Sequence, residues 1–114
     1  MHMTLTIQRV SQTNNDISKI IDKVLKQIFG VEATLLIYRY LEKTYSLRQD
    51  EIAQKIDLFA KGLEEFLNSG AHMVERKILD DIYKSYGLLR KIELDGLRQE
   101  FDFVTQVKIL THRA

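Results

Sequence analysis

The sequence predicts an all-α fold, a compact bundle of five to six helices. It contains no proline, the residue that breaks helix interiors most strongly. Between Asp16 and Tyr86, apolar residues recur every three to four positions, as in helices that bury one face. Gly30, Gly70 and Gly87 each follow such a run, at the place where a helix C-cap often needs positive φ.

Two segments are expected, a flexible N-terminal arm over residues 1–12 and a single helical domain over residues 13–114. The arm alternates briefly between apolar and polar residues, which favours an extended segment or a frayed terminus. The first helix is expected over residues 16–29, because Asn14 or Asn15 can cap the free amides of its first turn.

The second helix is expected over residues 31–43, directly after Gly30. A helix that is apolar on most sides is buried on most sides. We therefore expect this segment to be the central buried helix of the bundle. Its apolar residues are Ala33, Leu35, Leu36, Ile37, Tyr38, Tyr40 and Leu41.

Three further helices are expected before Gly87. A capping box formed by Ser46 and Gln49 precedes a short helix over residues 48–56. Asp57 is expected to cap the next helix, over residues 58–68. The following helix spans residues 71–86 and turns its apolar side inward, with Val74, Ile78, Leu79 and Ile82.

The C-terminal segment fits two structures. Its apolar residues suit one face of a helix within residues 97–112, beginning near Asp102. They also alternate, and residues 90–109 could form a β-hairpin around Asp95-Gly96. We favour the helix, because no other part of the chain offers a strong partner strand.

Composition narrows the classes of function. The chain has no cysteine, and neither a glycine-rich phosphate loop nor an apolar stretch long enough to span a bilayer occurs. No signal-peptide pattern is present at the start, so we expect a cytoplasmic protein without a membrane partner. Seventeen basic residues face sixteen acidic ones, and this balance argues against a dedicated nucleic-acid binder.

Candidate catalytic residues are few. His72 is the one histidine away from the terminal segments, and Ser69 beside it is better explained as a helix N-cap. His72 and Glu75 share a helix face at i, i+3, but a metal ion would need at least one or two further ligands. We therefore expect no catalytic, cofactor or metal site, and a protein that is not an enzyme.

A heptad-like stripe indicates a dimer interface. Six apolar residues between Ile17 and Leu35 are spaced 4-3-4-3-4, which is the seam of a coiled coil. The alternative is an ordinary stripe that faces the core, since the pattern is short for an isolated coiled coil. The candidate interface residues are Ile17, Ile21, Val24 and Ile28.

A basic row on the first helix gives an alternative function. Lys19, Lys23 and Lys26 lie about one turn apart and, together with Arg9, could contact phosphates. The row is also what a solvated helix face normally carries, since Asp16 and Asp22 lie nearby. Nucleic acid is therefore the alternative partner rather than the favoured one.

Part of the chain resembles a known protein family. The resemblance rests on four stretches, which are Ala33 to Lys43, Asp50-Glu51-Ile52, Leu63 to Ala71 and Val74 to Ile78. They resemble a family of small archaeal proteins that looks like the Nitrosopumilus output domain of archaeal signalling proteins. The resemblance implies an all-α fold and an interaction or output role, and it brings no active site. Together with the heptad-like stripe, it predicts a module of archaeal signal transduction that binds a second copy or another protein.

Overall fold

The protein is described by a computed structural model for residues 2–86 and 102–113, with side chains for residues 14–85 and 102–110. Over these residues no strand occurs, so the predicted all-α fold is confirmed. The predicted number of five to six helices stays a prediction, because residues 87–101 lie outside the described residues. The elements are α1 (His2–Tyr45), η1 (Gln49–Glu51), α2 (Ile56–Leu67), η2 (Asn68–Gly70), α3 (Ala71–Tyr86) and α5 (Phe103–Arg113).

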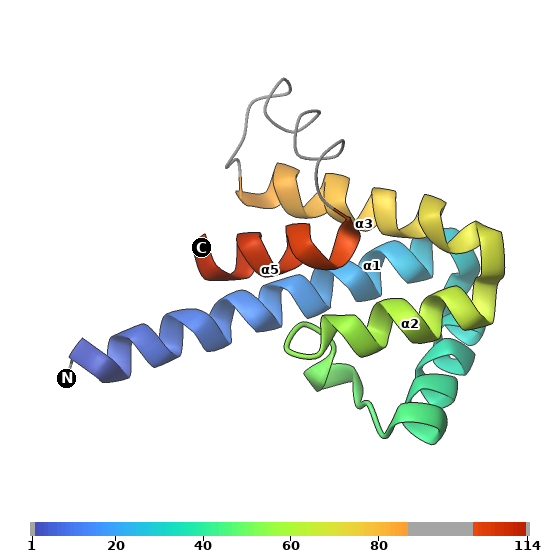
Figure 1. Ribbon diagram of the computed structural model, residues 1–114, viewed down its shortest axis with the longest axis horizontal. Helices are drawn as coiled ribbons and strands as arrows, with labels where there is room; N and C mark the ends of the chain where they lie inside the picture. Colours follow the sequence, from blue (N-terminus) through green and yellow to red (C-terminus); the bar gives the residue numbers. More distant parts are fainter. Residues whose placement is uncertain (1, 87–101, 114) are drawn as a thin grey trace.

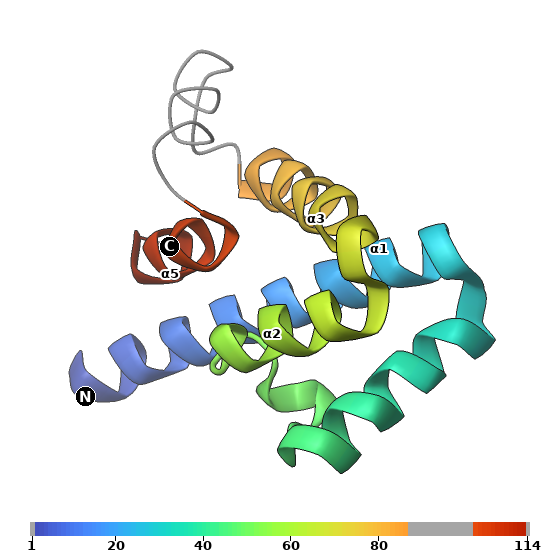
Figure 2. The ribbon, with the colours of Figure 1, turned by 45° about the vertical axis from the view of Figure 1, so that its right-hand side comes forward.

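Helix α1 is bent at Gly30, where the backbone leaves the helical conformation with φ 85° and ψ 171°. Glycine alone adopts this region readily, because in any other residue the Cβ atom would clash with the backbone of that residue. The bend divides α1 into a first arm (residues 2–29) and a second arm (residues 31–45), which diverge in Figure 2.

A side chain at Gly30 is expected to destabilise the bend. Nothing lies within 4 Å of a Cβ atom built there, so the cost comes from the backbone conformation alone. We expect Gly30→Ala to lower the free energy of unfolding by about 1–3 kcal/mol. Gly70→Ala is the control, since its φ is not positive and its surroundings are open. Urea unfolding followed by circular dichroism measures both, and an unchanged midpoint for Gly30→Ala would contradict the expected strain.

Polar contacts brace the bend. The Tyr38 hydroxyl on the second arm donates a 2.7 Å hydrogen bond to Asp22 Oδ1 on the first arm. Asp22 also pairs with Lys26 Nζ at 2.9 Å, one turn further along the first arm. The Thr34 hydroxyl on the second arm donates to the Gly30 carbonyl at 2.7 Å, which adds a contact at the bend itself.

The core lies where α2, α3 and α5 meet the two arms of α1 (Figure 1). Phe59 of α2 is fully buried and faces Phe103 of α5, with ring centroids 6.4 Å apart. Gly62 lets α2 approach the second arm, because a Cβ atom there would overlap the Leu41 side chain. Between α3 and α5, the Tyr83 hydroxyl donates a buried 3.0 Å hydrogen bond to Gln106.

Residues 2–12 continue the first arm as helix, so an extended conformation is wrong there, whereas the flexibility expected of residues 1–12 stays a prediction. The central position expected of the second helix is wrong. The segment 31–43 is a peripheral helix rather than the central one, because Leu35 and Leu36 are exposed to solvent. It buries a narrower stripe against the core, with Thr34, Ile37 and Leu41.

The helices after residue 55 are close to their predicted bounds. The prediction for residues 71–86 is confirmed, and its four inward residues are buried. The predicted 58–68 helix is α2, which begins at Ile56. The predicted 48–56 helix is wrong, because a 3-10 turn and hydrogen-bonded turns occupy it.

The C-terminal helix is confirmed from Phe103, and the hairpin is wrong over residues 103–109. Asp102 precedes the helix and accepts a 2.8 Å bond from the Thr105 amide, as an N-cap does. The part of the prediction over residues 97–101 lies outside the described residues.

The dimensions fit a folded domain of this length. The radius of gyration is 14.2 Å, close to the roughly 13 Å expected for a compact chain of this size. Among the described helices, none combines the length and the apolar character that crossing a bilayer requires.

Candidate functional site

The heptad-like stripe of the first arm faces the core. Ile17, Ile21 and Val24 each have 0% exposure, and they pack in the main apolar cluster. Their burial within one chain leaves no surface for a partner, so the prediction that these three form a dimer interface is wrong. Ile28, the fourth residue of the candidate interface, is exposed.

Four apolar residues around the bend are exposed instead, and we call them the kink surface. They flank Gly30, which turns the second arm so that its apolar stripe does not continue the buried stripe of the first arm. Single exposed apolar residues are ordinary, whereas a cluster of them often marks an interaction site. The exposed fractions are 43% for Ile28, 58% for Val31, 47% for Leu35 and 54% for Leu36.

The second arm has two distinct faces. At 3.6 residues per turn, Leu35 and Leu36 lie on the side of the helix opposite its buried stripe. Glu32 stands one turn before them and Arg39 one turn after them, and both are exposed. Within the described part of the chain, no ion pair involves either side chain. The outer face therefore consists of two leucines between an acidic and a basic residue.

The predicted phosphate contacts lie on the exposed side of the first arm. Lys19, Lys23 and Lys26 are all exposed, but Lys26 is neutralised by its ion pair with Asp22. The side chain of Arg9 lies outside the described residues. Of the three lysines, Lys19 and Lys23 are therefore the two that are exposed and not paired with a carboxylate on this part of α1.

A second group of basic residues lies between the first arm and α3. Lys23 shares a shallow cavity of about 310 Å³ with Lys77 and Lys84. Asp81 lines the same cavity and pairs with Lys77 at 3.1 Å. The positive charge of the three lysines is therefore partly offset by Asp81, just as basic and acidic residues nearly balance over the whole chain.

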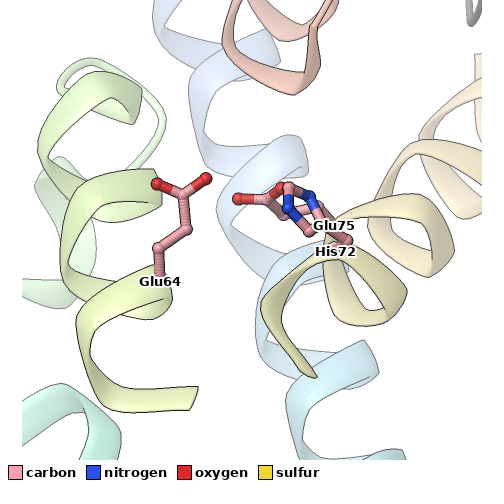
Figure 3. A group of neighbouring side chains, drawn as sticks. All are labelled: Glu64, His72 and Glu75. Atoms are coloured by element: carbon pink, nitrogen blue, oxygen red, sulfur yellow. The ribbon is translucent and has the colours of Figure 1, made fainter. Parts of the chain in front are cut away.

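A cleft of about 630 Å³ lies between α2, α3 and the start of α5. Figure 3 shows Glu64 on α2 and the pair His72 and Glu75 on α3, pointing toward one another. His72 Nδ1 lies 3.6 Å from Glu75 Oε1. One ligand atom from each of the three residues lies within 4.8 Å of the others.

Glu75 is the buried member of this group. Its side chain is 6% exposed, whereas that of His72 is 81% exposed. Its Oε2 atom is buried and has no hydrogen-bond partner. Burial, together with the nearby carboxylates of Glu64 and Asp102, raises the pKa of Glu75 from 4.5 to about 7. A buried acid with an unsatisfied oxygen is costly unless a proton or a cation compensates it.

The cleft is acidic. Four carboxylates line it, those of Asp57, Glu64, Glu75 and Asp102, against the cationic side chains of Lys61 and Arg76. Asp57 also pairs with Lys108 of α5 at 3.0 Å, across the edge of the cleft. With Asp57 paired, three carboxylates face two cationic side chains, so the cleft has a surplus of one negative charge when Glu75 is ionised, and this suits a cationic ligand.

Sequence reasoning found part of this group and missed the rest. The i, i+3 spacing of His72 and Glu75 was visible on one helix, and we expected no metal site because the other ligands were missing. Glu64 lies on α2, and only the turn over η2 brings it opposite α3. The sequence shows only that Glu64 is an acidic residue on the preceding helix. Many other exposed glutamates fit the same description, so this does not single it out as a ligand.

Comparison with known proteins leaves the site to be interpreted on its own geometry. No protein family model, curated protein or solved structure matches the chain. The resemblance to the archaeal family accordingly stays a prediction. The kink surface and the cleft are the two features on which a function can be argued.

Proposed function

We propose that this protein is a helical interaction module that forms a homodimer through the kink surface. The observation that carries the proposal is the exposure of Leu35 and Leu36, at 47% and 54%, on the outer face of the second arm. Burying a fully exposed leucine side chain is worth roughly 1.5–3 kcal/mol, and about half of this can still be gained at each of the half-exposed Leu35 and Leu36. A partner that covers Leu35 and Leu36 on each chain therefore buries four leucine side chains, and this burial favours association.

The charges on this face favour a second copy as the partner. In an antiparallel pair of second arms, a two-fold axis between Leu35 and Leu36 places Glu32 opposite the partner's Arg39. Because the axis repeats the contact, two such pairs flank the four leucines. A closed two-fold contact of this kind needs one self-complementary patch, and the outer face supplies it.

The proposal gives the stripe of the first arm a different role from the predicted one. Ile17, Ile21 and Val24 hold the fold of each chain, and the dimer uses the second arm instead. The resemblance to archaeal output domains adds the proposal that the dimer serves as an output module in signal transduction.

A charge placed in the kink surface is expected to separate the two copies. We expect sedimentation velocity at micromolar concentration to show a dimer for the wild-type protein and a folded monomer for Leu36→Asp. The matched control is Met73→Asp on α3, because Met73 is 74% exposed and lies outside the kink surface. A monomeric wild-type protein, or a Leu36→Asp variant that still dimerises, would contradict the proposal.

Nucleic acid is the competing partner, and the same preparation tests it. The exposed Lys19 and Lys23 are its support, and phosphate contacts are strongest at low salt. A duplex that is retarded at low salt by the wild-type protein, and is released when both lysines are replaced by glutamine, would favour that function. Our proposal expects no retardation.

A further inference from the structure

We propose that Glu64, His72 and Glu75 form a binding site for a divalent first-row transition-metal ion of the Zn²⁺ type. The site would lie in the cleft between α2 and α3, away from the kink surface. It therefore does not depend on the proposed dimer, and either proposal can fail alone.

The geometry brings three suitable ligands together. The ligand atoms lie within 4.8 Å of one another. Two ligands bound to one Zn²⁺ ion at about 2.0–2.1 Å can be at most about 4.2 Å apart. Any pair of ligand atoms that is farther apart than this has to move closer together around an ion. Glu64 and His72 are exposed, so their side chains can change rotamer and close on Glu75 without moving the core.

Glu75 supplies a separate indication of a ligand. Its side chain is more than nine-tenths buried, and Oε2 has no hydrogen-bond partner although Glu75 lines the cleft. Buried polar atoms are nearly always satisfied, so an unsatisfied carboxylate oxygen at a cavity needs an explanation. A cation bound at that oxygen would satisfy it and offset the desolvation of the carboxylate.

The ligand types select the class of metal. An imidazole nitrogen suits Zn²⁺ and neighbouring transition metals, whereas Mg²⁺ and Ca²⁺ prefer oxygen ligands alone. The two carboxylates would neutralise a divalent charge. Three protein ligands leave a coordination position open to the cleft, as in zinc sites that exchange water or a small ligand.

Isothermal titration calorimetry with Zn²⁺ tests the site on the full chain. We expect one Zn²⁺ ion to bind per chain, with an affinity that falls at least about tenfold in His72→Ala, in Glu64→Gln and in Glu75→Gln. Changes in outer-shell partners alone alter metal affinity by about 10–100-fold, so loss of a ligand should have at least this effect. Mg²⁺ is expected to bind much more weakly than Zn²⁺.

Two controls separate this site from adventitious binding. Glu65→Gln changes the neighbouring glutamate on α2, which instead accepts a hydrogen bond from the Tyr40 hydroxyl. His2→Ala changes a histidine that is not one of the three proposed ligands. Both variants should bind Zn²⁺ like the wild-type protein. A wild-type protein that binds no Zn²⁺ would overturn the proposal, as would equal affinities for Zn²⁺ in His72→Ala and in the wild-type protein.

Discussion

Replacing Ile21 with aspartate is expected to destabilise the folded chain strongly, by the same amount at any protein concentration. Ile21 is fully buried on the first arm, and an aspartate there would place a carboxylate in the apolar core without a partner. We expect the free energy of unfolding to fall by more than about 4 kcal/mol, against a total of about 5–15 kcal/mol for a domain of this kind. Circular dichroism and urea unfolding at a fixed concentration measure the change.

The same substitution distinguishes a core stripe from an interface stripe. If Ile21 faced a second copy, Ile21→Asp would give a folded monomer that unfolds like the wild-type monomer. Lys23→Asp is the control on the same arm, because Lys23 is exposed, and we expect it to change stability by about 0.5 kcal/mol at most. A folded, stable Ile21→Asp variant would show that the stripe is not part of the core.

Replacing Glu75 with glutamine is expected to stabilise the metal-free protein, and only above acidic pH. The folded protein raises the pKa of Glu75 from 4.5 to about 7. Between these values the folded state binds more protons at Glu75 than the unfolded state, so the stability of the wild-type protein falls as pH rises. The shift corresponds to about 3 kcal/mol above pH 7 as an upper value, since each pKa unit is worth about 1.4 kcal/mol.

The measurement is a series of urea unfolding curves between acidic and alkaline pH, with a chelator present. The curves of Glu75→Gln and the wild-type protein should coincide below the ordinary glutamate pKa and separate as pH rises toward 7. Glu42→Gln is the control, because Glu42 is exposed on the second arm. A constant difference across the whole pH range would contradict the assigned cause, which is burial beside Glu64 and Asp102.

The helical fold was predictable because its signals are local. The three- and four-residue spacing of apolar residues between Gly70 and Gly87 predicted α3, and Asp102 marked the start of the C-terminal helix. Periodicity does not show whether an apolar stripe meets its own core or another chain, and this explains the error over Ile17, Ile21 and Val24. Only the packing of α3 and α2 against the first arm shows that this stripe faces the core of its own chain.

The second arm differs from its prediction for a related reason. Its apolar residues surround most of the helix, which predicts burial on all sides. The bend at Gly30 turns the arm so that the core can cover one side alone, and Leu35 and Leu36 remain outside. A glycine between two helical runs signals a break, but its dihedral angles, and hence the direction of the next helix, depend on tertiary contacts such as that between Tyr38 and Asp22.

The cleft illustrates what spacing within one helix can reveal. His72 and Glu75 lie on one helix, so their proximity follows from the helical repeat. The position of Glu64 depends on the angle between α2 and α3, which is set by the turn over η2 and by packing in the core. The start of α5 lines the same cleft as Glu75, and the position of α5 has no signal in the sequence around residue 75.

A charge-reversal experiment tests the dimer through the kink surface most directly. In the proposed arrangement, Glu32→Arg brings two arginines together at each symmetry-related contact, and Arg39→Glu brings two glutamates together. Sedimentation equilibrium should therefore show weaker dimers for each single variant. The double variant restores opposite charges and should associate like the wild-type protein. A double variant as dissociated as the single variants, or a wild-type protein that remains a monomer, would contradict the account.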